Sequence, residues 1–204
     1  MLLVYLHTVT LYDCGAVSGN CSACVSTRTV SSFLCGWCNS ISCRVQEECQ
    51  PPLITDGLQC PSPEITTFSP SSGPPRGGTV ITIEGMNLGV AFEDFNAPDS
   101  ITVGGESCTP LSEDYISGAR VLCRTNAGLR TGAVTVTLQR SGGPASMTAE
   151  DDFTVTLPTV SSVSPDIGPI AGGSSLRMEG TGLDVGNSAR VFLNGENGPE
   201  CVMT

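Results

Sequence analysis

Apolar and polar residues alternate along several short stretches of the chain. Four stretches carry this alternation with their apolar residues at Ile81 and Ile83, at Ile101 and Val103, at Val134, Val136 and Leu138, and at Phe153, Val155 and Leu157. A period of two with one apolar face is typical of strands in an antiparallel sheet with one buried face. Glycine-rich turn signals such as Gly104-Gly105 and Ala127-Gly128 separate these stretches. The pattern predicts about seven short strands that form an immunoglobulin-like β-sandwich over residues 63–157.

The beginning of this predicted sandwich occurs a second time near the C-terminus. Ten of its residues recur 95 positions later: Pro63, Ser69, Pro70, Gly73, Pro74, Gly77, Gly78, Glu84, Gly85 and Leu88 match Pro158, Ser164, Pro165, Gly168, Pro169, Gly172, Gly173, Glu179, Gly180 and Leu183. A constant offset over so many glycines and prolines indicates an internal repeat. The glycines are expected to supply positive φ angles and close approach of strands.

The second copy is predicted to be the first half of another sandwich, over residues 158–204. Its Cys201 corresponds to Cys108, which we expect to pair with Cys123 as a local disulfide across neighbouring strands. The partner of Cys201 is expected some 15 residues beyond Thr204, by analogy with the Cys108–Cys123 spacing. We therefore expect the repeat to be truncated and the least stable part of the chain.

Charge and hydropathy exclude some functions. The net charge is −11 with only nine Lys and Arg residues, which argues against binding of nucleic acid and of anionic membrane surfaces. No apolar run reaches the roughly 18 residues needed to span a bilayer. Residues 1–12 alternate in the manner of a strand and lack the features of a signal peptide. We expect them to be the terminal strand of a preceding repeat.

Eight of the eleven cysteines lie in residues 13–61, a segment too short to be held together by apolar burial alone. The pair Cys21-Ser-Ala-Cys24 and Cys35-Gly-Trp-Cys38 has the spacing of zinc ligands. The even cysteine count, with no histidine nearby except His7, fits four disulfides of a secreted protein. A redox site at Cys35–Cys38 would need a βαβ context that the sequence does not show. Spacing alone leaves the zinc and disulfide interpretations open.

The cysteine pattern resembles the PSI domain of plexins, semaphorins and integrins, and Cys-Gly-Trp-Cys is its most distinctive element. The resemblance implies four disulfides: Cys14–Cys35, Cys21–Cys60, Cys24–Cys43 and Cys38–Cys49. It also implies that Trp37 packs as the core aromatic residue. A hydroxyl-rich insert at residues 26–33 departs from the usual PSI sequence and affects the local loop.

The repeated stretch resembles the IPT/TIG domain, through Ser-Pro-x-x-Gly-Pro-x-x-Gly-Gly followed by Val-Gly-Gly-x-x-Cys and Val-Leu-Cys. A PSI domain followed by IPT repeats, with Phe92-Glu93-Asp94 and Tyr115-Ile116-Ser117, resembles plexin order and wording. The resemblance implies a stalk segment on the extracellular side of the plasma membrane, in a single-pass semaphorin receptor with a role in signalling and axon guidance. Semaphorin binding and the transmembrane helix would lie in regions outside this chain, and receptor self-association is a further implied contact. The alternative is a secreted or other TIG-domain binding protein.

Candidate chemistry is sparse, and we expect no enzyme, metal or cofactor site. His7 has no matched nucleophile, and the pairs Glu93-Asp94 and Glu113-Asp114 lack the spacing of a Ca²⁺ loop, as does the run at residues 150–152. The sequon Asn20-Cys21-Ser22 predicts an N-glycan on Asn20 if the chain is secreted.

Overall fold

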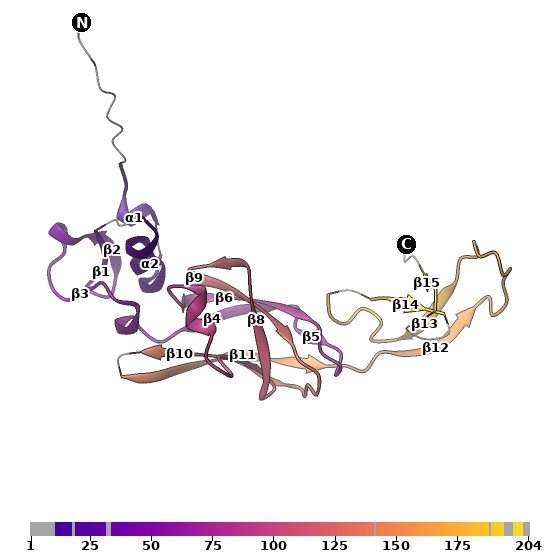
Figure 1. Cartoon of the computed structure of the whole chain (residues 1–204). Coiled ribbons are helices and arrows are strands. Elements are labelled where there is room, and N and C mark those ends of the chain that lie inside the picture. The colour runs from indigo at the N-terminus through magenta and orange to yellow at the C-terminus, as the bar shows by residue number, and fades with distance from the viewer. Residues whose placement is uncertain are drawn as a thin grey trace, which may run out of the picture.

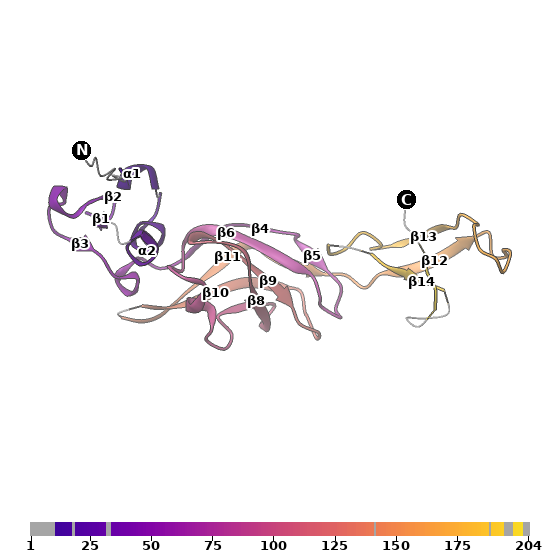
Figure 2. The same cartoon turned by 45° about the horizontal axis from the view of Figure 1, so that its top comes forward.

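The computed structural model describes residues 11–17, 19–31, 34–140, 142–187, 189–193 and 198–201. Three parts follow one another in a row: a cysteine-rich module containing α1 to η2, a sandwich containing β4 to β11, and a C-terminal segment containing β12 to β15 (Figure 1; Figure 2). The predicted strand at residues 1–12 and the candidate His7 fall almost entirely outside the described residues.

The cysteine-rich module packs helix α2 against a small sheet. Its elements are α1 (Cys14–Val17), α2 (Cys21–Ser31), β1 (Cys35–Cys38), β2 (Ser42–Val45), η1 (Gln46–Glu48), β3 (Leu53–Ile54) and η2 (Gly57–Gln59), and the strand order is β2-β1-β3. Its core consists of cysteines together with Val25 and Trp37. The structure thus confirms Trp37 as the core aromatic residue.

Much of the hydroxyl-rich insert is helical rather than a loop, because α2 extends to Ser31. Two of the hydroxyl groups find partners within the helix: Ser26 donates to the carbonyl of Ala23 at 2.8 Å, and Thr27 donates to that of Cys24 at 2.7 Å. Such bonds to the preceding turn let hydroxyl residues occupy a helix without leaving a polar group unsatisfied.

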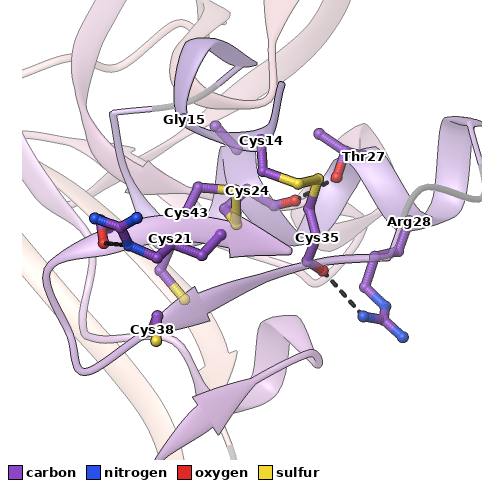
Figure 3. The surroundings of a disulfide bond; sticks show 12 residues. Cys14, Gly15, Cys21, Cys24, Thr27, Arg28, Cys35, Cys38 and Cys43 are labelled. Atoms are coloured by element: carbon purple, nitrogen blue, oxygen red, sulfur yellow. Dashed lines mark hydrogen bonds between the residues drawn. A yellow bond between two sulfur atoms is a disulfide. The ribbon is translucent and has the colours of Figure 1, made fainter. Parts of the chain in front are cut away.

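Four disulfides hold the module together. They join Cys14 to Cys35, Cys21 to Cys60, Cys24 to Cys43 and Cys38 to Cys49. These are the pairs that the PSI resemblance implies. Figure 3 shows several of these cysteines between α2 and the sheet, where Arg28 of α2 also donates to the carbonyl of Cys35 at 3.0 Å.

The sandwich is built from strands of the predicted kind. They are β4 (Glu64–Ser69), β5 (Ser72–Gly73), β6 (Val80–Leu88), β7 (Ile101–Val103), β8 (Glu106–Ile116), β9 (Gly118–Thr125), β10 (Gly132–Arg140) and β11 (Gly143–Val155), with η3 (Phe92–Phe95) after β6. The hydrogen-bonded order is β4-β6-β9-β8-β7-β10-β11-β5. The long strand β8 pairs first with β7 and then with β9, so it links the two layers.

The alternation in the sequence correctly predicts eight of its ten apolar positions as buried; Val155 is only partly buried and packs against the core. Ile81, Ile83, Val134, Val136 and Phe153 are fully buried. The prediction that Leu157 is buried is wrong. Its side chain is 67% exposed, because β11 ends at Val155 and the chain leaves the sandwich there. The expected local disulfide Cys108–Cys123 is present and joins β8 to β9.

The repeat has a structural counterpart in β12 (Thr159–Ser164) and β13 (Arg177–Thr181), which pair as β4 and β6 do. A Cβ added to Gly85 would lie 1.9 Å from the carbonyl oxygen of Glu64, and one added to Gly180 would lie 1.9 Å from that of Thr159. The same close approach of strands therefore requires glycine in both copies. The short strands β14 (Val191–Phe192) and β15 (Glu200–Cys201) complete the C-terminal segment.

Candidate functional site at the junction of the cysteine-rich module and the sandwich

The start of helix α2 meets the sandwich through Asn20. Its side-chain Oδ1 accepts a hydrogen bond from the backbone N–H of Ala23 at 2.9 Å, which caps the helix. Its Nδ2 donates to the carbonyl of Gly118 in β9 at 3.2 Å. Asn20 is only 7% exposed, so both ends of the amide are used in a buried position. One side chain therefore caps a helix in one domain and binds the backbone of the next.

A second hydrogen bond joins the start of α2 to the sandwich, and here the side chain belongs to β6 of the sandwich. The side-chain Oδ1 of Asn87, near the end of strand β6, accepts from the backbone N–H of Ser22 at 3.3 Å. Asn87 has a φ of 56°, a left-handed conformation that asparagine tolerates better than most residues. Because hydrogen bonds between buried groups are costly to leave unmade, the two bonds together oppose separation of the domains.

Apolar packing adds to this contact. Val90, in the loop after β6, packs against the core of the cysteine-rich module. It lies so close to Gly57 that a Cβ on that glycine would be 2.3 Å from Val90 Cγ2. A groove of about 510 Å³ runs along this contact, lined by residues of both domains that include Val25, Leu58 and Val90. The junction thus combines buried hydrogen bonds with direct side-chain packing.

An aromatic cluster supports the loop after β6 from within the sandwich. The rings of Phe92 and Phe95 each meet the ring of Tyr115 edge to face, with centroids 5.9 and 6.0 Å apart. Burial raises the pKa of the Tyr115 hydroxyl above its usual range, because the charged phenolate would lose its solvation inside the cluster. The hydroxyl of Ser117 also donates to the carbonyl of Val90 at 2.7 Å. These contacts hold the loop in the position from which it reaches the cysteine-rich module.

The cysteines of the zinc-like motif do not lie together as a ligand set. Cys21, Cys24, Cys35 and Cys38 each bond to a different partner. Cys35 and Cys38 are not joined to each other, as a redox-active pair would be. The disulfide interpretation therefore fits the structure, and the zinc interpretation does not.

The environment of Asn20 argues against the glycan that the sequon predicts. N-glycosylation attaches a bulky sugar to the asparagine side-chain nitrogen. In the structure that nitrogen is Nδ2, which donates to Gly118 inside the junction. A glycosylated amide keeps one N–H, but Asn20 is only 7% exposed, so the sugar would have to be accommodated between the two domains. In the folded chain Asn20 is a buried junction residue, a position that disfavours the glycan, and glycosylation of Asn20 stays a prediction.

The acidic residues named from the sequence have structural surroundings. Asp94 Oδ2 accepts from the backbone N–H of Val90 at 2.7 Å and so stabilises the turn into η3. Glu113, Asp114 and residues 150–152 lie exposed on the surface. Among the described residues, no group of three or more His, Cys, Asp or Glu side chains is placed to hold a metal ion.

Sequence analysis missed the junction. The sequence predicts a role for Asn20 only through its sequon, and it predicts none for Gly118. The only local signal was an asparagine directly before a helix, which is a common capping position. No local pattern pairs Asn20 with a glycine 98 residues away.

Comparison with known proteins shows which proteins this chain is similar to. Residues 63–155 match the family model described as "IPT/TIG domain". Plexin-B3 of Mus musculus is 36% identical over 196 residues, which cover 95% of this chain and 10% of the relative. Plexin-A2 of Homo sapiens is 30% identical over 198 residues, covering 92% of this chain and 10% of the relative. The chain is homologous to plexins.

A solved plexin structure places the homology in the extracellular part of the receptor. The structure described as the plexin A4 full extracellular region matches with a TM-score of 0.70 and 29% identity, over 87% of this chain and 16% of that one. The chain spans about a tenth of the length of the plexins it matches in sequence. In the described part of the chain, no helix is long and apolar enough to cross a membrane.

Proposed function

We propose that the chain is a stalk segment of a plexin-like semaphorin receptor at the cell surface, in which it acts as a rigid spacer between other receptor domains. Its modules would be the PSI domain at residues 13–61, an IPT/TIG domain at 63–157 and the first half of another at 158–204. Semaphorin binding and signalling to the cell interior would belong to regions outside this chain. Plexin homology over nearly the whole chain supports the assignment to a receptor stalk.

The observation that carries the spacer role is the buried hydrogen bond from Asn20 to Gly118. Domains joined only by a flexible linker tumble independently. Relative motion of domains is also the usual expectation when the contacts between them are small. Here the linker between Cys60 and β4 is three residues long and contains Pro61 and Pro63, which restrict the backbone. The linker and the buried contacts together favour one fixed orientation.

The substitution Gly118→Ala tests this role. A Cβ at this position would lie 2.3 Å from Asn20 Oδ1 and 2.7 Å from the backbone nitrogen of Ala23, so the helix must move away. Residual dipolar couplings measure whether two domains share one orientation. In the unaltered chain we expect the cysteine-rich module and the sandwich to fit a single alignment tensor. In Gly118→Ala we expect two tensors of different magnitude.

Gly105→Ala is the matched control. Gly105 has a φ of 84°, close to the 71° of Gly118, but a Cβ there would meet no atom within 4 Å. Both variants carry the strain of alanine in a left-handed conformation, about 1–2 kcal/mol, and only one disturbs the junction. A single tensor in Gly118→Ala, or two tensors in Gly105→Ala, would contradict a spacer held rigid by this contact.

Membership in a receptor is tested by locating the full-length protein that contains this segment. An antibody against the sandwich is expected to detect it in the washed membrane fraction of the source cells. Protease added outside intact cells should remove the signal, because the segment would face outward. Recovery of the protein only from the medium would instead support the alternative, a secreted TIG-domain binding protein.

A further inference from the structure

A second contact between domains lies at the other end of the sandwich, around Asn187. The Nδ2 of Asn187 donates to the carbonyl of Val80 at 2.9 Å, and its Oδ1 accepts from the backbone N–H of the same residue. One side-chain amide therefore binds both polar groups of a single residue in the preceding domain. Asn187 follows β13 in the C-terminal segment, and Val80 opens β6 of the sandwich.

The backbone of Val80 is available because the neighbouring strand stops short of it. The pairing of β4 with β6 ends where Ser69 lies opposite Thr82. On the other side of β6, the hydrogen bond to β9 at this point is made by the residue before Val80: the carbonyl of Thr79 accepts from the N–H of Thr125 at 2.9 Å. An open strand edge presents one donor and one acceptor, and an asparagine amide offers the complementary pair. Asn187 thus takes the place of a further strand residue at this edge.

The loop that carries Asn187 is the repeat counterpart of the loop at the first junction. With the offset of 95 residues, Val90 corresponds to Val185, Ala91 to Gly186 and Phe92 to Asn187. In the sandwich, the end of β6 and the loop after it contact the cysteine-rich module through Asn87 and Val90, respectively.

In the C-terminal segment, the corresponding loop after β13 contacts the sandwich. Asn187 binds Val80, and Gly186 lies so close that an added Cβ would be 3.1 Å from Thr79 Oγ1. In both copies, the loop after the second strand contacts the domain that precedes its own in the chain.

We propose that this loop is a docking element that each IPT repeat uses to fix itself on the domain before it. We call residues 86–92 and 181–187 the docking loops; each includes the end of its strand, β6 or β13, and the loop that follows it. Their partner is the domain immediately preceding in the same chain. The individual contacts differ. Val90 and Asn87 make them at the first junction, and Gly186 and Asn187 make them at the second. What is common is the position of the loop in the fold. The inference extends the proposed spacer role and rests on it.

Amide hydrogen exchange of Val80, followed by NMR, tests the second docking loop directly. In the unaltered chain the Val80 amide should be protected by Asn187 Oδ1. Asn187→Ala removes the acceptor, and we expect exchange of Val80 to become about tenfold faster, the scale of losing one hydrogen bond. Asn187→Asp retains an acceptor oxygen and should preserve the protection. Dipolar couplings of the C-terminal segment and the sandwich should share one tensor in the unaltered chain and not in Asn187→Ala.

Asn96→Ala is the control, because Asn96 is an exposed asparagine of the sandwich outside both docking loops. It should leave the exchange of Val80 and the shared tensor unchanged. Unchanged exchange of Val80 in Asn187→Ala would overturn the docking loop. The spacer role would survive unchanged exchange of Val80 as long as Gly118→Ala still separates the first two domains. If neither variant alters domain orientation, both the docking loop and the spacer fail.

Discussion

Replacing Cys21 and Cys60 together by alanine is expected to unfold the cysteine-rich module while the sandwich stays folded. This disulfide closes a loop with a sequence separation of 39 residues, for which the loss of chain entropy in the unfolded state gives about 4 kcal/mol. So small a module has little apolar core with which to compensate. Cys21 also lies between Asn20 and Ser22, the two residues that bind the sandwich. Losing the bridge should therefore release the junction as well.

Trp37 gives a specific measurement of this loss. It is the only tryptophan of the chain and is buried in the core of the cysteine-rich module. Its fluorescence during urea unfolding should show the module already unfolded in the Cys21→Ala, Cys60→Ala double variant. The matched control removes Cys38–Cys49, whose separation of 11 residues corresponds to about 3 kcal/mol. Fluorescence of the Cys21/Cys60 double variant indistinguishable from that of the unaltered chain would show that this bridge does not hold the module together.

Phe153→Ala is expected to destabilise the sandwich by about 3–5 kcal/mol, the usual cost of truncating a fully buried aromatic side chain. Phe153 is the largest fully buried side chain of the described residues. It lies in β11 and reaches β5, where a Cβ on Gly73 would be 2.8 Å from its ring. The truncation would leave a cavity between these strands. Urea unfolding followed by the far-ultraviolet circular dichroism of the β-structure measures the change.

Leu157→Ala is the control for this prediction. The alternation of the sequence places Leu157 on the same face as Phe153, yet it is 67% exposed beyond the end of β11. Its truncation should change the free energy of unfolding by no more than about 0.5 kcal/mol. Equal effects of the two substitutions would show that the strand continues through residue 157, in disagreement with the structure.

The contrast between Phe153 and Leu157 shows how far a local pattern reaches. A period of two reports which face of a strand is buried as long as the strand lasts. It does not report where the strand leaves the sheet, because that depends on the partner strands. The insert at residues 26–33 shows the same limit, since its hydroxyl groups are compatible with a loop and, through bonds to the preceding turn, with the helix observed.

The sequence by itself determined the sandwich core, the 95-residue repeat, the cysteine-rich composition of the first module and the resemblance to plexins. These features can be predicted from the spacing of residues close in sequence, because apolar alternation, glycine positions and cysteine intervals directly reflect strand faces, turns and cross-links. The tertiary structure alone decided how the domains meet. Asn20 binds Gly118 across 98 residues, and Asn187 binds Val80 across 107. Such bonds depend on the orientation of whole domains. That orientation produces no repeating pattern in the sequence around the residues that form the bonds.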